Sequence, residues 1–371
     1  MKSRSLLALL LGISITLGCA AQAYAYAPLG HEIVGSIADE RLANTPTAAK
    51  IRALIGNLSL EKAALLADTI KGWDKKGVDN PKSFRVAAPK IDRQLRGFWR
   101  ANQPSYGILT APSHHWFHYT DVPVMPAQNY SDGTVGRSKW DIVHMIPYCM
   151  EVLRGRRPEQ NERKITKPVA LILLVHYVAD IHQPLYVGAQ YFDEQGRVAD
   201  PGRDKSALAD EGGNTFTLEL SDEPPRTRGV RKKKFHAFWD YDAVNALFPQ
   251  MPIRVRKREL QTQIAPLKKR LVRELATNEP TSWRMPANVD ITNYAEAWAN
   301  EILPIAREAH KRLQFTNVHP QQEKARVVAV GVANEKPQPD QISYRAWASN
   351  VVREELHKAG WRLADLLEKT L

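Results

Sequence analysis

Helical periodicity constrains the fold of this 371-residue chain more than any other feature. Apolar residues recur at intervals of three and four in the stretches that begin at Pro28, Ser59, Arg137 and Lys167. The same spacing predicts four further helices, around 234–247, 256–278, 291–313 and 344–371. Strand-like alternation is nearly absent, so the sequence predicts an all-α fold built from many helices.

Proline, glycine and charged residues concentrate between these helices. Pro28 and Pro168 stand where proline suits the first turn of a helix. The long polar connections cover 78–113, 191–211, 221–229 and 317–341. None of them separates two hydrophobic cores, because the candidate metal-binding and catalytic residues are spread over all the early helices. We therefore expect a single domain spanning 26–371.

The first 25 residues have the pattern of a signal peptide. Lys2 and Arg4 precede a mostly apolar run, and the sequence AYA ends at Ala25. The apolar run, 6–17, is shorter than the roughly 20 residues that span a bilayer. We expect a secreted or periplasmic protein without a membrane span, cleaved before Tyr26.

The two cysteines bear on processing and on stability. Cys19 leaves a lipoprotein as an alternative, although Thr16 is a poor residue for a lipoprotein signal. Cleavage before Tyr26 would leave Cys149 alone, so no intrachain disulfide could form. Another kind of interaction must then stabilise the fold.

The net charge is +12, and loss of Lys2 and Arg4 with the signal peptide lowers it to +10. The densest basic run is RTRGVRKKK, 226–234. A net positive charge of this size favours a polyanionic partner through long-range attraction. A solvated loop that aids solubility is the alternative.

Two His/Asp pairs share one spacing. His176 with Asp180, and His236 with Asp240, stand four residues apart in apolar helical stretches. Residues four apart lie on one helix face, so each pair can aim an imidazole and a carboxylate at one metal ion. A histidine bonded to its own helix is the alternative for one pair, but the repetition argues against coincidence.

Further nitrogen and oxygen donors precede these pairs: His31, Asp68, His118 and Asp121. Imidazole and carboxylate without thiolate suit zinc, with coordination positions left open for water.

Taken in order, the motifs GH at 30–31, LAD at 66–68, HYTD at 118–121 and H-x-x-x-D-x-H-Q-P-L at 176–185 resemble those of the zinc-dependent single-strand nucleases of the S1/P1 family. The resemblance runs from Tyr26 nearly to the C-terminus. It implies hydrolysis of single-stranded DNA and RNA to 5′-phosphate products, 3′-nucleotidase activity and a zinc cluster in a cleft. No protein partner is implied.

The resemblance assigns roles residue by residue. Tyr26 would bind zinc through its amino nitrogen and carbonyl oxygen, and Asp180 would bridge two ions. The remaining implied ligands are His31, Asp68, His118, His176, His236 and Asp240. Asp121 would orient the attacking water. Asp74 is an alternative to Asp68 but points away from it, and His114 and His115 are expected to be rim or structural residues.

One position departs from the family pattern. Tyr186 stands where the family has a ligand histidine of the third zinc site. Two zinc ions are therefore expected, while the third site has three alternatives: a phenol ligand, a recruited nearby group or weak binding. A neutral phenol is a poor ligand, since its pKa is near 10.

Two residues are expected to contact the substrate. Tyr119 could stack on an unpaired base, and Asn214 in DEGGN could contact a base or a phosphate, although a plain turn also explains the glycines. Zinc-dependent phospholipase C is the alternative function. A non-catalytic metal-binding or nucleic-acid-binding relative is the third, because Tyr186 breaks the motif.

Overall fold

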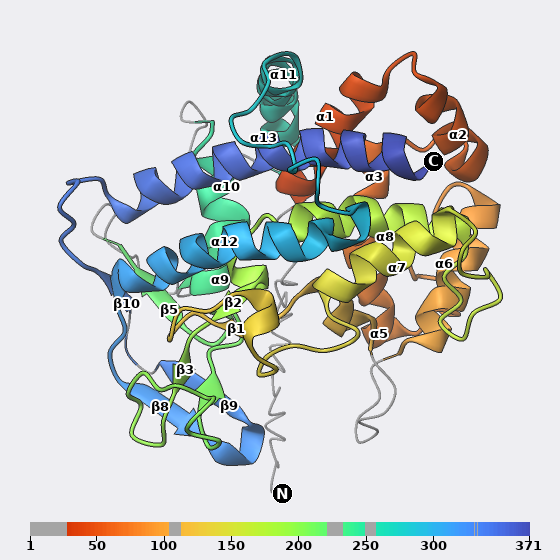
Figure 1. The fold of residues 1–371 in the computed structure, drawn as a ribbon. Helices are drawn as coiled ribbons and strands as arrows, with labels where there is room; N and C mark the ends of the chain where they lie inside the picture. The colour runs from red at the N-terminus through yellow and green to blue at the C-terminus, as the bar shows by residue number, and fades with distance from the viewer. Residues whose placement is uncertain (1–27, 104–112, 221–232, 249–256, 330, 332) are drawn as a thin grey trace, which may run out of the picture.

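The computed structural model describes residues 28–103, 113–220, 233–248, 257–329, 331 and 333–371. Helices dominate this part of the chain, as predicted (Figure 1). The predicted signal peptide, Tyr26, the connection 221–229 and most of the basic run lie outside the described residues. No helix within the described ranges is both long and apolar enough to cross a membrane.

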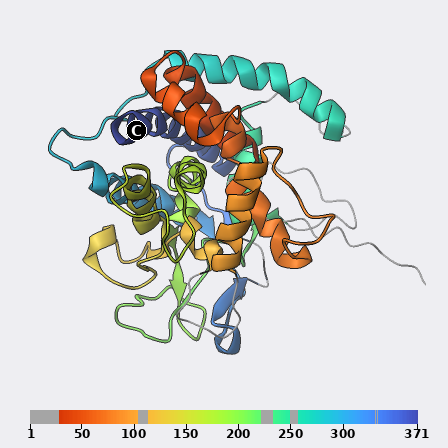
Figure 2. The ribbon, with the colours of Figure 1, turned by 90° about the vertical axis from the view of Figure 1, so that its right-hand side faces the viewer.

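Helix α8, Lys167–Asp180, forms the centre of the core. Pro168 lies in its first turn, as predicted, and the Thr166 side chain caps it by accepting a hydrogen bond from the Val169 amide. Every residue from Pro168 to Asp180 is buried, as expected of a helix that is apolar on all sides. Figure 2 looks along this helix and shows others around it.

The neighbours of α8 come from both ends and from the middle of the chain. Helices α1 (Pro28–Leu42), α7 (Ile142–Leu153) and α13 (Tyr344–Thr370) all pack against it, and α13 also lies along α1. Helices α11 (Lys257–Thr277) and α12 (Tyr294–Lys311) occupy two other predicted stretches. Predicted helices at both termini of the described chain are therefore confirmed.

Two predicted helices are interrupted. The stretch from Ser59 forms four short pieces: α3 (Leu60–Ala63), α4 (Leu66–Thr69), the 3-10 turn η1 (Ile70–Gly72) and α5 (Trp73–Lys76). The stretch around 234–247 forms α9 (Phe235–Ala237), a π-helical turn η5 (Phe238–Asp242) and α10 (Ala243–Asn245). Such turns are frequent at functional sites.

Helices α2 (Pro46–Ile55) and α6 (Pro89–Ala101) were not predicted. The interpretation of 78–113 as an uninterrupted polar connection was wrong, because α6 lies within it. Ile91, Leu95 and Phe98 are buried one turn apart, and charged residues occupy much of the rest of the helix.

Short strands place the described chain outside a strict all-α class, so that part of the prediction needs correction. A four-stranded sheet has the order β6 (Lys233–Lys234), β5 (Thr217–Glu219), β10 (Ala333–Glu335), β7 (Leu313–Gln314). Strands β5 and β10 run parallel, and the other neighbours are antiparallel. Three two-stranded pairs complete the set: β1 (Val122–Pro123) with β2 (Gly188–Ala189), β3 (Tyr191–Phe192) with β4 (Leu208–Ala209), and β8 (Val318–Gln321) with β9 (Arg326–Ala329). The connections predicted at 191–211 and 317–341 thus contain strands.

Candidate active site

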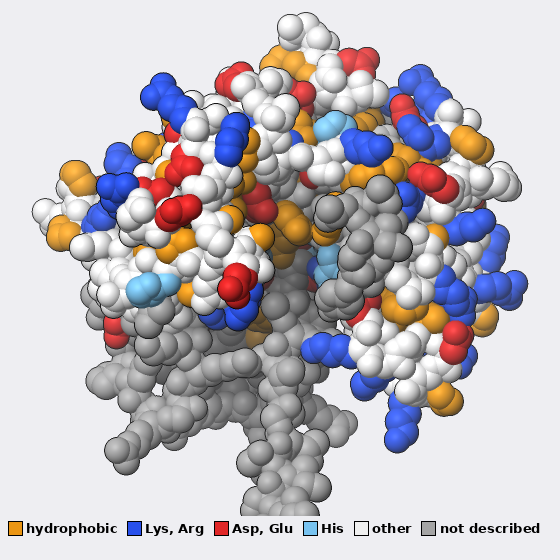
Figure 3. Space-filling view, turned by 90° about the horizontal axis from the view of Figure 1, so that it is seen from below, with side chains coloured by type: hydrophobic (Ala, Val, Ile, Leu, Met, Phe, Trp, Pro, Cys, Tyr) orange, Lys and Arg blue, Asp and Glu red, His pale blue; other side chains and the backbone are white. Residues whose placement is uncertain are grey.

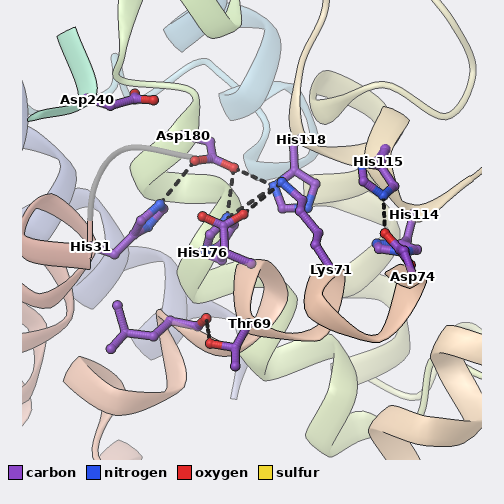
Figure 4. A network of polar contacts seen from close by, with 12 residues as sticks. His31, Thr69, Lys71, Asp74, His114, His115, His118, His176, Asp180 and Asp240 are labelled. Atoms are coloured by element: carbon purple, nitrogen blue, oxygen red, sulfur yellow. Dashed lines mark hydrogen bonds and ion pairs between the residues drawn. The ribbon is translucent and has the colours of Figure 1, made fainter. Parts of the chain in front are cut away.

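Five predicted metal ligands meet in the interior, and we call them the inner cluster: His31, Asp68, His118, His176 and Asp180. Figure 4 labels all of them except Asp68. They come from α1, α4, the 3-10 turn η2 (His114–His118) and α8. All five are buried, with at most 5% of each residue exposed. The packing of α1, α4 and η2 around α8 therefore fixes their positions.

Asp180 lies at the middle of the inner cluster. Its Oδ2 is 2.9 Å from His118 Nδ1 and 3.1 Å from His176 Nε2, while its Oδ1 is 3.3 Å from His31 Nε2. Asp68 Oδ1 lies 3.6 Å from His176 Nε2. One carboxylate thus faces three imidazoles, the arrangement expected of a carboxylate that joins two ligand sets.

Hydrogen bonding around His176 shows that this geometry suits a cation. His176 Nδ1 donates to the Ala64 carbonyl at 2.6 Å, so Nε2 of the neutral ring carries a lone pair. That lone pair faces two carboxylates, and His118 Nδ1 lies 3.1 Å away. Such a group of acceptors is stable only around a proton or a metal ion, and a backbone bond to the far ring nitrogen is typical of metal-bound histidine.

The pKa shifts describe the same centre. Burial and the Lys71 charge lower the pKa of His118 to about 3, so that ring is neutral at ordinary pH. Burial opposes ionisation of Asp180, but His176 and its other imidazole partners hold the pKa of the carboxyl well below its usual range. Burial opposes protonation of His176, but Asp180 and Asp68 raise its pKa, so a metal ion at Nε2 would take the place of this proton. Ionised carboxylates and neutral imidazoles are the forms that bind zinc.

The second predicted pair, which we call the outer pair, consists of His236 and Asp240. His236 Nδ1 donates to the Gly212 carbonyl at 2.8 Å, which leaves Nε2 3.5 Å from Asp240 Oδ2. Gln183 Nε2 donates to Asp240 Oδ1 at 3.0 Å. The Tyr186 ring lies edge-on to His236 with centroids 4.8 Å apart. The structure therefore brings all three residues of the predicted third site together.

A cavity of about 260 Å³ opens beside both groups. The predicted residues among its lining are His118, Tyr119, Asp121, Tyr186, Asn214, His236 and Asp240. Burial, together with Asp210 and Glu211, raises the pKa of Asp121 to about 7. A carboxylate in this range can exchange protons near neutral pH.

Two chemically active lining residues were missed from the sequence. Lys71, three residues after Asp68, places Nζ 2.7 Å from Asp68 Oδ1 at the edge of the cavity. Glu211 lines the same cavity, and Asn214 Nδ2 donates to its carbonyl at 2.9 Å. The spacing from Asp68 could have suggested Lys71, but lysine is too common on helices for this to be a strong signal.

The alternatives around Asp68 are separated by the geometry. Asp74 lies away from the inner cluster and contacts His114 and His115 instead. His114 is buried, and His115 is partly exposed at the cavity, as expected of structural and rim residues. Tyr26, the remaining predicted ligand, lies outside the described residues.

Acidic and basic side chains both lie on the described surface of the molecule seen from below, with many Lys and Arg side chains along the right-hand edge (Figure 3).

Comparison with known families accords with this geometry. The family model described as S1/P1 Nuclease matches residues 26–371, nearly the whole chain. Members of this family are zinc-dependent nucleases, so the match favours a nuclease over a phospholipase C. No curated protein matches the chain.

Proposed function

Because the chain belongs to the S1/P1 nuclease family, we propose that it hydrolyses the phosphodiester bonds of single-stranded DNA and RNA to 5′-phosphate products and also acts as a 3′-nucleotidase. The observation that carries this proposal is one cavity lined by His118 of the inner cluster, by the outer pair and by Asp121.

The ligand set fits zinc, because buried carboxylates and imidazole nitrogens converge at one centre without a thiolate. Asp180 would serve two ions, with Tyr26 and the rest of the inner cluster as their other ligands. The outer pair would hold a third ion, with Tyr186 beside it. Bound zinc supplies Lewis acidity that activates water and polarises the phosphate.

The chain's own residues then handle the proton and the charge. Asp121 accepts a proton from the attacking water, since its pKa of about 7 leaves much of it ionised at neutral pH. Lys71 presents a cation at the cavity wall and can neutralise a phosphate oxygen. These roles require both side chains to face the same substrate group.

Preference for single strands follows from how bases are bound. Tyr119 is 37% exposed at the cavity, so an unpaired base can stack on its ring. Stacking of this kind contributes roughly 1 to 3 kcal/mol per base and tolerates different sequences. Asn214, which is exposed and lines the same cavity, can donate to a base or a phosphate.

Export completes the proposal, because removal of the signal peptide would free the Tyr26 amine, which is the proposed zinc ligand. One extra residue before Tyr26 should remove most of the activity, whereas Tyr26→Trp should be nearly silent because main-chain atoms bind the metal. Full activity of the extended protein would exclude the amine from the mechanism.

The central test is hydrolysis of single-stranded DNA, RNA and phosphatidylcholine side by side, with zinc measured per chain. Release of 5′-phosphate products from the nucleic acids alone supports the proposal. Zinc binding without turnover would support a non-catalytic relative, and hydrolysis of the lipid would support a phospholipase C.

A further inference from the structure

A second group of imidazoles surrounds a carboxylate outside the proposed zinc ligands (Figure 4). Asp74 Oδ2 is 2.6 Å from His115 Nε2, and its Oδ1 is 3.2 Å from His114 Nε2. Trp99 Nε1 also donates to Oδ1, at 2.6 Å. The three donors fix the carboxylate, and the carboxylate in turn fixes the rings.

The same two chain segments build this group and part of the inner cluster. The segment α4–η1–α5 carries Asp68 and Asp74, while η2 carries His118 and His115. Residues three apart share one face of a 3-10 helix with a rise of about 6 Å between them. His115 therefore extends the face that presents His118, at a distance comparable to that between successive phosphates of an extended strand.

The pKa directions within the group fit hydrogen bonds from the rings to an ionised Asp74. Burial opposes ionisation of Asp74, but hydrogen bonds from the two imidazoles and the indole hold the pKa of its carboxyl well below the ordinary value. Burial lowers the pKa of His114 to about 4, so that ring stays neutral. His115, with 41% of its side chain exposed, is the member of the group that lines the cavity.

We propose that His115 forms a subsite for the backbone phosphate next to the scissile one, with Asp74 as its positioning residue. This subsite rests on the proposed nuclease function. Because Nε2 of His115 contacts Asp74 and the residue lines the cavity, Nδ1 is the ring nitrogen left for a ligand. With a phosphate at Nδ1 and a carboxylate at Nε2, the ring would lie between two anions, and only an imidazolium donates to both at once.

A metal ion is the competing occupant of this group. Zinc would need Nε2 of His114 and of His115 without protons. Both atoms, however, face the Asp74 carboxylate, which already accepts a hydrogen bond from Trp99. Lys71 also lies close enough to lower the pKa of His114, and its charge disfavours a second cation. The hydrogen-bonded form therefore fits the group better than a metal site does.

The experiment measures how much each additional phosphate contributes to binding. Affinities of the full mature protein are compared for phosphorothioate oligothymidylates with one and with three backbone phosphates, which keep their charge and resist cleavage. In His115→Gln the affinity for the longer ligand should fall about tenfold, and that for the shorter less than twofold. In Asp74→Asn both affinities should fall as they do in His115→Gln, more for the longer ligand than for the shorter, but by smaller factors.

His144→Gln is the matched control. His144 Nδ1 lies 3.0 Å from Asp141 Oδ1, half of its side chain is exposed, and it does not line the cavity. This variant should bind both ligands as the wild type does.

Equal losses for both ligands in His115→Gln, or no loss for either, would overturn the subsite. Loss of one zinc per chain in this variant would overturn it in favour of a metal site. Turnover of unmodified oligonucleotides is measured separately, so an inactive wild-type protein would refute the proposed function while the affinity ratio still decides the subsite.

Discussion

Two His/Asp pairs with identical spacing behave in opposite ways. In the inner cluster, three imidazoles hold the pKa of Asp180 well below its usual range. In the outer pair, burial raises the pKa of Asp240 well above its usual range, and Gln183 is the closest donor. Spacing along a helix therefore brings two side chains together, whereas the residues around them decide which form they adopt and how firmly they bind a cation.

The largest effect is expected for Asp180→Asn. Because the proposed bridging carboxylate serves two ions, its loss should release zinc and lower nuclease activity on the order of a thousandfold. Asp240→Asn, in the outer pair, should cost less metal and less activity. Zinc per chain and oligonucleotide hydrolysis are the measurements, and a mutant that keeps both inner zinc ions would argue against bridging.

Removal of zinc should lower the stability of the fold, since binding to the folded state adds directly to stability. At free zinc about a thousandfold above its dissociation constant, this linkage contributes about 4 kcal/mol. Calorimetry with and without a chelator measures the effect. The Asp240→Asn variant should retain most of the stabilisation by zinc. An unchanged melting temperature after chelation would refute a stabilising role.

Tyr186 allows the outer pair to be strengthened. Zinc prefers imidazole to a neutral phenol, so Tyr186→His should hold the third ion several-fold more tightly and keep or raise activity. Zinc per chain after mild chelation is the measurement, and Tyr186→Phe is the control. Three firmly bound ions in the wild type that fall to two only in the Phe variant would mean that the phenol itself is a ligand.

The smallest effect concerns the pH dependence of Asp121. Burial, then Asp210, then Glu211 raise its pKa to about 7, and the ionised form is the proposed base, so activity should rise with pH through this range. Glu211→Gln removes one negative neighbour and should move the acid limb down by about half a pH unit. A pH–rate profile tests the shift, and a move to higher pH would contradict the assignment.

The sequence predicted those features that have a local signal. His176 and Asp180 were found because an apolar helix carrying both on one face is recognisable from spacing alone. The order of the motifs then implied the rest of the inner cluster. Helix α6 was missed because charged residues such as Arg93 and Arg96 interrupt its apolar positions.

Features that depend on distant segments could not be predicted. The pairing of β5 with β10 joins residues more than a hundred positions apart, and strands of two or three residues have no periodicity to detect. The raised pKa of Asp121 likewise depends on Asp210 and Glu211, which approach it only in the folded chain. Lys71 and His115 became candidates only when the cavity showed what they face.

The bonds from His176 Nδ1 to the Ala64 carbonyl and from His236 Nδ1 to the Gly212 carbonyl have a spectroscopic consequence. Both ring protons are buried and hydrogen-bonded, so they should exchange slowly with solvent and give resolved signals in nuclear magnetic resonance. Their exchange rates would report separately on local opening around the core helix and around the glycine turn. The two pairs could then be followed independently in a single unlabelled sample, without any probe attached to the metal.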